Sequence, residues 1–276
     1  MDDRAIGVFD SGVGGLTALR ELTEQLPREH IIYLGDSYNM PYGEKTREEI
    51  VGLSRKNLGF LLRRGVKAVL VACGSATVNA LDVLEKESPV PILGVVAPAV
   101  EEAARLTRNN CIGVLATRAS IRTHAFRDAI LERRGSFAVV SRACPVFATM
   151  VEYGIYDPED ERIRAAALEY LPPIRKAGAD TIILGCTHYP LLSEVIKKYV
   201  GADNRLISGG QVRLVSSGAA AARQLARFIR ENGLECARDN HRLEYFTTGQ
   251  AEDFARSAGY MLQRDISGQL TAIDPL

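Results

Sequence analysis

The stretch Lys67-Ala68-Val69-Leu70-Val71-Ala72-Cys73-Gly74-Ser75 decides the fold, because a short apolar run ends in a cysteine followed by small and hydroxyl-bearing residues. A second stretch, Asp180-Thr181-Ile182-Ile183-Leu184-Gly185-Cys186-Thr187-His188, repeats this design 113 residues later, from position 73 to position 186. Apolar runs of this length are typical of strands buried on both faces of a parallel sheet. Each cysteine therefore lies at the carboxyl end of a predicted strand.

A second repeat has nearly the same spacing. Ile6-Gly7-Val8-Phe9-Asp10-Ser11 matches Ile112-Gly113-Val114-Leu115-Ala116-Thr117, 106 residues further on. The two repeats together predict two related halves. Because ligands bind outside the carboxyl ends of the strands in open α/β sheets, we expect the two thiols to flank one cleft between the halves.

Apolar runs alternate with amphipathic stretches, which is typical of an α/β fold with mainly parallel sheets covered on both faces. The predicted strands are residues 5–9, 31–35, 68–72, 92–95, 111–115, 137–141, 181–184, 205–207 and 242–247. The predicted helices include 14–25, 47–64, 76–86, 98–106, 121–134, 159–177, 191–200 and 212–231. We expect two pseudo-symmetric lobes, the first from residues 1–97 and 208–276 and the second from residues 98–207. Val96-Ala97-Pro98 is the predicted hinge.

Composition excludes several classes of protein. The 276 residues carry 34 basic and 34 acidic side chains, so no charge excess indicates a nucleic acid or an anionic membrane surface as partner. The uncharged run from Ala68 to Leu81 is too short and too polar to span a bilayer. No basic segment followed by an apolar one opens the sequence, and five scattered cysteines fit reduced thiols, so we expect a cytoplasmic protein.

A glycine-rich turn, Phe9-Asp10-Ser11-Gly12-Val13-Gly14-Gly15, follows the first predicted strand. Backbone amides at such a turn can hold an anion, but Asp10 would repel one. Asp10 is better suited to a protonated partner, such as an ammonium group or a thiol that must lose its proton. The alternative interpretation is a tight turn that packs closely.

Cys73 and Cys186 are candidates for acid/base chemistry, which needs the thiolate of a group with a pKa of about 8.5. His188 could move a proton to or from Cys186. A single cysteine is more often a small core residue, but two in matching contexts favour function. A metal site at Cys186 and His188 lacks further ligands at suitable spacing, so no metal is predicted. The remaining cysteines, Cys111, Cys144 and Cys236, have no such surroundings.

With these segments together, the chain resembles the glutamate racemases, cofactor-independent enzymes that interconvert L- and D-glutamate. The resemblance extends from about Ile6 to Leu262. Its motifs are Phe9 to Leu16, Pro41-Tyr42-Gly43, the Cys73 segment, Val151-Glu152-Tyr153-Gly154, Leu184 to Pro190 and Phe246-Thr247-Thr248-Gly249.

The resemblance implies a two-base mechanism and no cofactor. Cys73 would take the α-proton from D-glutamate and Cys186 from L-glutamate, with Asp10 assisting Cys73 and His188 assisting Cys186. It also implies that D-glutamate is supplied for peptidoglycan. Implied substrate-binding or ordering positions are Ser11, Tyr42, Gly43, Gly74, Ser75, Thr117, Ser120, Glu152 and Thr187.

Four positions depart from the family pattern. Gly74 and Ser75 stand where Asn and Thr are usual, Ala99 replaces a glycine at the hinge, and Ser208 replaces an aspartate. Gly74 would then lack an amide contact to the substrate, and losing one such donor can cost about a hundredfold in rate. The alternatives are a racemase or isomerase of another acidic amino acid, such as aspartate, and a weakened homologue that only binds such acids. A homodimer is also compatible with the sequence.

Overall fold

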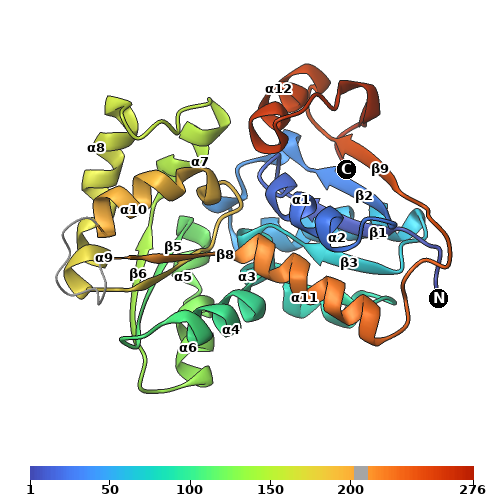
Figure 1. Cartoon of the computed structure of the whole chain (residues 1–276). Helices are drawn as coiled ribbons and strands as arrows, with labels where there is room; N and C mark the ends of the chain where they lie inside the picture. The colour runs from blue at the N-terminus through green and yellow to red at the C-terminus, as the bar shows by residue number, and fades with distance from the viewer. Residues whose placement is uncertain (202–210) are drawn as a thin grey trace.

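Two parallel sheets organise the chain, as a computed structural model shows for residues 1–201 and 211–276 (Figure 1). The first sheet has the strand order β10-β9-β2-β1-β3-β4, and every neighbouring pair is parallel. Its strands are β1 (Ile6–Asp10), β2 (His30–Gly35), β3 (Ala68–Val71), β4 (Ile92–Leu93), β9 (Arg242–Thr247) and β10 (Leu270–Ala272). The last two strands return from the carboxyl-terminal part of the chain to the lobe that contains the amino terminus.

The second sheet repeats the centre of the first. Its order is β6-β5-β7-β8, again all parallel, with strands β5 (Cys111–Ala116), β6 (Ala138–Ala143), β7 (Thr181–Leu184) and β8 (Arg213–Ser216). In the first sheet Gly7 pairs with Val69, and in the second Gly113 pairs with Ile182. Each catalytic candidate lies four residues beyond the paired position, Cys73 after Val69 and Cys186 after Ile182. The internal repeat in the sequence therefore corresponds to equivalent places in the two sheets.

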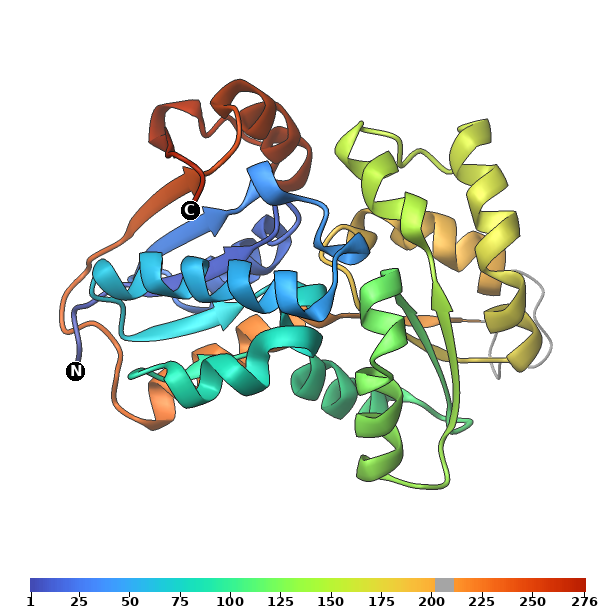
Figure 2. The same cartoon turned by 180° about the vertical axis from the view of Figure 1, so that it is seen from behind.

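Helices cover both faces of each sheet. Around the first sheet lie α1 (Leu16–Gln25), α2 (Arg47–Arg63), α3 (Gly74–Glu87), α11 (Ser217–Glu231) and α12 (Ala251–Leu262). The helices of the second lobe are α4 (Val96–Leu106), α5 (Arg118–Arg122), α6 (Ala125–Arg133), α7 (Pro145–Glu152), α8 (Glu161–Tyr170), α9 (Pro172–Ala177) and α10 (Ser193–Gly201). Figure 2 shows α2 and α3 on the face of the first sheet that is opposite to α1 and α11.

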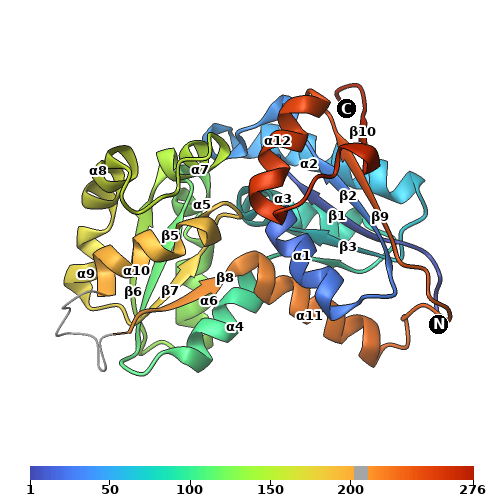
Figure 3. The ribbon, with the colours of Figure 1, turned by 45° about the horizontal axis from the view of Figure 1, so that its top comes forward.

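Successive side chains of a strand point to opposite faces of the sheet and therefore belong to separate hydrophobic cores. In β1, Ile6 and Val8 belong to a core shared with α1, α11 and α12, whereas Phe9 packs towards α2 and α3. The first of these cores continues into the second lobe through Leu115, Leu184 and the helices α7 to α10. Because this apolar core extends across both lobes, it holds their strand ends next to one another. Figure 3 shows the two lobes side by side, with α11 beneath the first lobe.

Some expectations about the elements are wrong. The region 212–231, predicted as one helix, divides into strand β8 and helix α11, and β8 pairs with β7 in the second sheet. The chain therefore returns to the first lobe after Ser216. The predicted strand 205–207, Ser208 and the predicted boundary between the lobes at residues 207 and 208 lie outside the described residues.

Two further differences concern helices. The predicted helix 159–177 is broken between Tyr170 and Pro172 into α8 and α9, because a proline cannot continue the hydrogen-bond ladder. Helix α7 was not predicted, although Pro145 at its start is a typical first helical residue. Among the described residues, no helix combines the length and the apolarity needed to cross a bilayer.

Candidate functional site

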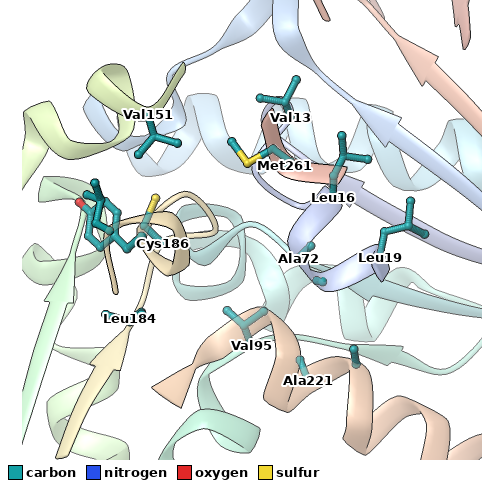
Figure 4. Close-up of a cluster of buried hydrophobic side chains, with 14 of the residues drawn as sticks. Val13, Leu16, Leu19, Ala72, Val95, Val151, Leu184, Cys186, Ala221 and Met261 are labelled. Atoms are coloured by element: carbon teal, nitrogen blue, oxygen red, sulfur yellow. The ribbon is translucent and has the colours of Figure 1, made fainter. Parts of the chain in front are cut away.

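A cavity lies where the carboxyl ends of β3 and β7 face each other. Eleven of the thirteen predicted site residues line it: Ser11, Tyr42, Gly43, Cys73, Gly74, Ser75, Thr117, Glu152, Cys186, Thr187 and His188. The other two, Asp10 and Ser120, are buried directly behind the lining. Figure 4 shows Cys186 beyond Leu184 at the end of β7, and Ala72, which precedes Cys73, at the end of β3.

Cys73 is the N-cap of α3. Its backbone is extended, its sulfur accepts the backbone N–H of Ala76 at 3.5 Å, and its thiol donates to Ser11 Oγ at 3.6 Å. A helix amino terminus favours a thiolate, but the surroundings oppose it. Burial, together with the nearby carboxylate of Asp10, raises the pKa of Cys73 to about 12. The thiol of Cys73 is therefore protonated at neutral pH.

Asp10 ends β1 and is completely buried. Its Oδ2 accepts the backbone N–H of Gly15 at 2.9 Å and the hydroxyl of Thr187 in the other lobe at 3.5 Å. Burial raises the pKa of Asp10, while the nearby His188 opposes this shift. Oδ1 has no hydrogen-bond partner in the described part of the chain, so one acceptor remains available next to the cavity.

Cys186 has a different environment. Its sulfur lies 3.7 Å from Nδ1 of His188, and Nε2 of the same ring lies 3.0 Å from Oε1 of Glu152. The second contact has the distance of an ion pair, but its alignment is not that of a hydrogen bond. Burial on its own lowers the pKa of His188, but Cys186 and Glu152 outweigh it and hold the pKa well above its ordinary value. His188 is therefore an imidazolium that links Glu152 to the thiol.

The glycine-rich turn allows the loop of Cys186 to approach closely. A β-carbon on Gly14 would lie 2.3 Å from Oγ1 of Thr187 and 2.6 Å from the ring of His188. The hydroxyl of Thr17 also donates to the Thr187 carbonyl at 3.1 Å. The turn therefore serves close packing between the lobes, which agrees with the packing interpretation of these glycines.

A row of hydroxyl groups crosses the cavity. Ser75 Oγ and Thr117 Oγ1 are 2.9 Å apart, although they belong to different lobes, and Thr117 donates in turn to Ser120 Oγ at 3.1 Å. Thr117 is the N-cap of α5 and corresponds to Ser11 in the internal repeat. These groups can orient an anionic ligand, with Ser120 acting through Thr117.

Tyr42 lines the cavity, but its hydroxyl points away from it. That hydroxyl donates to Asp36 Oδ2 at 2.5 Å and accepts from Asn57 Nδ2 at 3.0 Å. Asp36 also accepts from the hydroxyl of Thr248 at 2.7 Å. These hydrogen bonds hold the loop from Gly35 to Gly43 in place, and its residues Met40 to Gly43 line the cavity.

Gly74 has a steric role that the sequence did not indicate. A β-carbon at this position would lie 2.1 Å from the backbone carbonyl oxygen of Gly185, in the other cysteine loop. No rotamer relieves a clash with a backbone atom, so any side chain at position 74 must move the two loops apart. The glycine is required by the closed arrangement of the lobes, a reason distinct from the loss of an amide contact.

Several lining residues were not predicted. They are Met40, Pro41, Glu44, Arg118, Pro145, Ala148, Thr149 and Gly185. Two of them could have been predicted from their place in the sequence. Arg118 directly follows Thr117, a predicted site residue at the end of β5, and Glu44 directly follows Gly43. No cluster of three or more His, Cys, Asp or Glu side chains suited to a metal occurs among residues 1–201 and 211–276.

Comparisons with known proteins agree with this geometry. The family model described as Asp/Glu/Hydantoin racemase matches residues 6–225. The chain is 40% identical over 261 residues to a glutamate racemase of Lactococcus lactis subsp. lactis, covering 94% of this chain and 92% of that protein.

Solved structures give the same result. The glutamate racemase isoform RacE1 of Bacillus anthracis superimposes with a TM-score of 0.91 at 34% identity and full coverage of both chains. The glutamate racemase of Francisella tularensis subsp. tularensis, in complex with D-glutamate, gives a TM-score of 0.88 at 31% identity and covers 100% of this chain and 98% of that one.

Proposed function

The chain belongs to the Asp/Glu/hydantoin racemase family, and we propose that it interconverts L- and D-glutamate with Cys73 and Cys186 as the two acid/base groups. The observation that carries this proposal is the position of both thiols, at equivalent strand ends of two facing lobes and on one cavity. A proton removed by one thiol and replaced by the other, on the opposite face of the α-carbon, inverts the configuration.

The two thiols have different neighbours. Burial and Asp10 keep Cys73 protonated. The sulfur of Cys186 lies 3.7 Å from Nδ1 of His188, a group that can take up or return a proton. In this proposal Cys186 removes the α-proton of the L enantiomer and Cys73 donates its proton on the opposite face. After inversion Cys73 is the thiolate, which is the base that the D enantiomer requires.

The developing carbanion needs stabilisation, because the α-proton beside a carboxylate is very weakly acidic. Hydroxyl groups of Ser11, Ser75, Thr117 and Thr187 line the cavity. A hydroxyl that turns from its present acceptor, as Thr117 can turn from Ser120, can donate a hydrogen bond to the substrate carboxylate. Such preorganised donors commonly account for about a hundredfold each in rate. Asp10 lies behind this lining and accepts from the hydroxyl of Thr187, so it can act on the substrate only through its neighbours. The biological role that we propose is the supply of D-glutamate for peptidoglycan.

The test is racemisation of purified protein without added cofactor, followed by circular dichroism from either enantiomer. We expect inversion of L- and D-glutamate, with kcat/KM equal in the two directions because the equilibrium constant between enantiomers is one. Aspartate, assayed in parallel, should react at least about a hundredfold more slowly, since one missing methylene displaces the second carboxylate. Faster turnover of aspartate, or binding of glutamate without turnover, would overturn the proposal.

A further inference from the structure

Contacts between α5 of the second lobe and the short 3₁₀ turn Tyr42–Glu44 of the first connect the two lobes beside the cavity. Arg122 Nη2 donates to the backbone carbonyl of Lys45 at 3.1 Å. One turn earlier on α5, Arg118 Nη1 lies 3.9 Å from Glu44 Oε1. Both contacts cross from one lobe to the other, but only Arg118 and Glu44 line the cavity.

The pair Arg118–Glu44 is weak and accessible. The two side chains are 61% and 57% exposed, and their separation is close to the upper limit for an ion pair. Ion pairs that are exposed to this extent contribute little, because water screens them and the long side chains lose conformational freedom. Arg118 can therefore exchange Glu44 for another carboxylate at small cost.

The charge balance of the cavity makes such an exchange favourable. Glutamate carries two carboxylates and one ammonium group, whereas Glu44 and Glu152 add two negative charges to the lining. The positive charge of His188 is engaged by Glu152 at 3.0 Å. Among the described residues, Arg118 is the only lysine or arginine that lines the cavity, so it is the one lining cation whose existing partner is easily displaced.

We propose that Arg118 binds the side-chain carboxylate of the substrate, with Glu44 as the competing internal carboxylate that it leaves. The guanidinium group suits this task because it can form two parallel hydrogen bonds to one carboxylate. This inference deepens the proposed function and rests on it: Arg118 selects substrates with a distal negative charge, while the thiols perform the inversion.

The test compares Arg118→Gln, Arg118→Lys, Glu44→Gln and the control Arg122→Gln. Arg118→Gln should raise KM for glutamate about tenfold with kcat within about threefold, because it removes a charge-assisted contact in a partly exposed site. Arg118→Lys should recover part of this loss. Glu44→Gln should lower KM, since the competitor has gone. Arg122→Gln removes a contact between the lobes but no cavity charge and should change KM by less than about twofold.

The outcomes separate this inference from the function on which it rests. An equal rise of KM in the Arg118→Gln and Arg122→Gln variants would show that Arg118 only helps to close the lobes, and a higher KM in Glu44→Gln would also overturn the inference. Calorimetric binding of glutamate to wild type and Arg118→Gln supplies an arm that does not depend on turnover. If the wild type binds glutamate without racemising it, the proposed function fails, while weaker binding by Arg118→Gln would still support the role of Arg118.

Discussion

The two segments that follow β3 and β7 and carry Cys73 and Cys186 occupy equivalent positions in their sheets. They differ in the charged groups that surround the sulfur. Asp10 ends β1 next to Cys73, and the corresponding residue at the end of β5 is Ala116. Cys186 therefore has no carboxylate in that place, and it contacts His188 instead, which is held by Glu152. A duplicated scaffold thus carries one thiol that is kept protonated and one that lies beside a cation. The equivalent strand ends of the two lobes place both thiols on the cavity, whereas their different neighbours set the acid and base properties of each side.

The largest expected effect comes from removing either thiol. Cys73→Ser and Cys186→Ser should each lower kcat about a thousandfold or more, because a hydroxyl is a much weaker acid than a thiol and its anion is not populated near neutral pH. The measurement is racemisation from both enantiomers, with circular dichroism to confirm folding. If one variant retained more than about a tenth of the activity, the two loops would not be equivalent partners in the reaction.

The second prediction concerns the pH dependence of activity, which distinguishes the Cys186 side of the cavity from the Cys73 side. Glu152→Gln should lower activity about a hundredfold at high pH and less at low pH, because Glu152 helps to hold the pKa of His188 above its ordinary value. Without that carboxylate the imidazolium loses its proton at lower pH, so the alkaline limb of the pH profile of kcat should shift to lower pH. An unchanged alkaline limb would contradict the assignment of the imidazolium to the Cys186 side.

A smaller effect is expected where the two loops touch. Gly74→Ala should lower kcat/KM about tenfold, since its β-carbon would meet the Gly185 carbonyl and separate the loops by a fraction of an ångström or more. Gly74→Asn should not raise turnover, for the same steric reason.

The matched control for the Gly74 variants is Gly52→Ala on α2, where a β-carbon meets nothing within 4 Å. It should leave activity unchanged and stabilise the helix slightly. An active Gly74→Asn variant that exceeds the wild type would show instead that an amide is missing from the site.

The smallest effect concerns Asp10. Alkylation of Cys73 by iodoacetamide should be slow at neutral pH and should increase roughly tenfold per pH unit towards its pKa of about 12. Asp10→Asn should speed this reaction about threefold at a given pH, because it removes a negative charge that opposes the thiolate. Peptide mapping by mass spectrometry would follow Cys73 and Cys186 separately. A slower reaction in Asp10→Asn would mean that Asp10 assists deprotonation of the resting thiol.

Much of the fold is predictable because local patterns and tertiary structure agree. The apolar runs ending at Ala72 and Leu184 are buried strands, as their composition indicates. The pattern fails at residues 212–216, where Val212, Leu214 and Val215 continue into an alanine-rich helix without a break in hydrophobicity. Pairing with β7, a contact between distant parts of the chain, makes this segment a strand.

The functional site is also predictable from the sequence only where local patterns determine it. Spacing and motif resemblance indicated Cys73, Cys186 and most of the lining, because strand ends on one edge of a sheet must lie together. The pairing of Glu152 with His188, the orientation of Tyr42 away from the cavity and the contact between Gly74 and Gly185 depend on how the two lobes close on each other. No local pattern encodes that closure.

The most direct test of the central claim is the fate of the α-hydrogen in heavy water at low conversion, measured by NMR or mass spectrometry on both enantiomers after separation. Two thiols on opposite faces predict that the product carries deuterium at the α-carbon while the recovered substrate keeps its proton, starting from either L- or D-glutamate. Transfer of the substrate proton into the product, or equal labelling of substrate and product, would contradict the account, because a single base would then serve both faces.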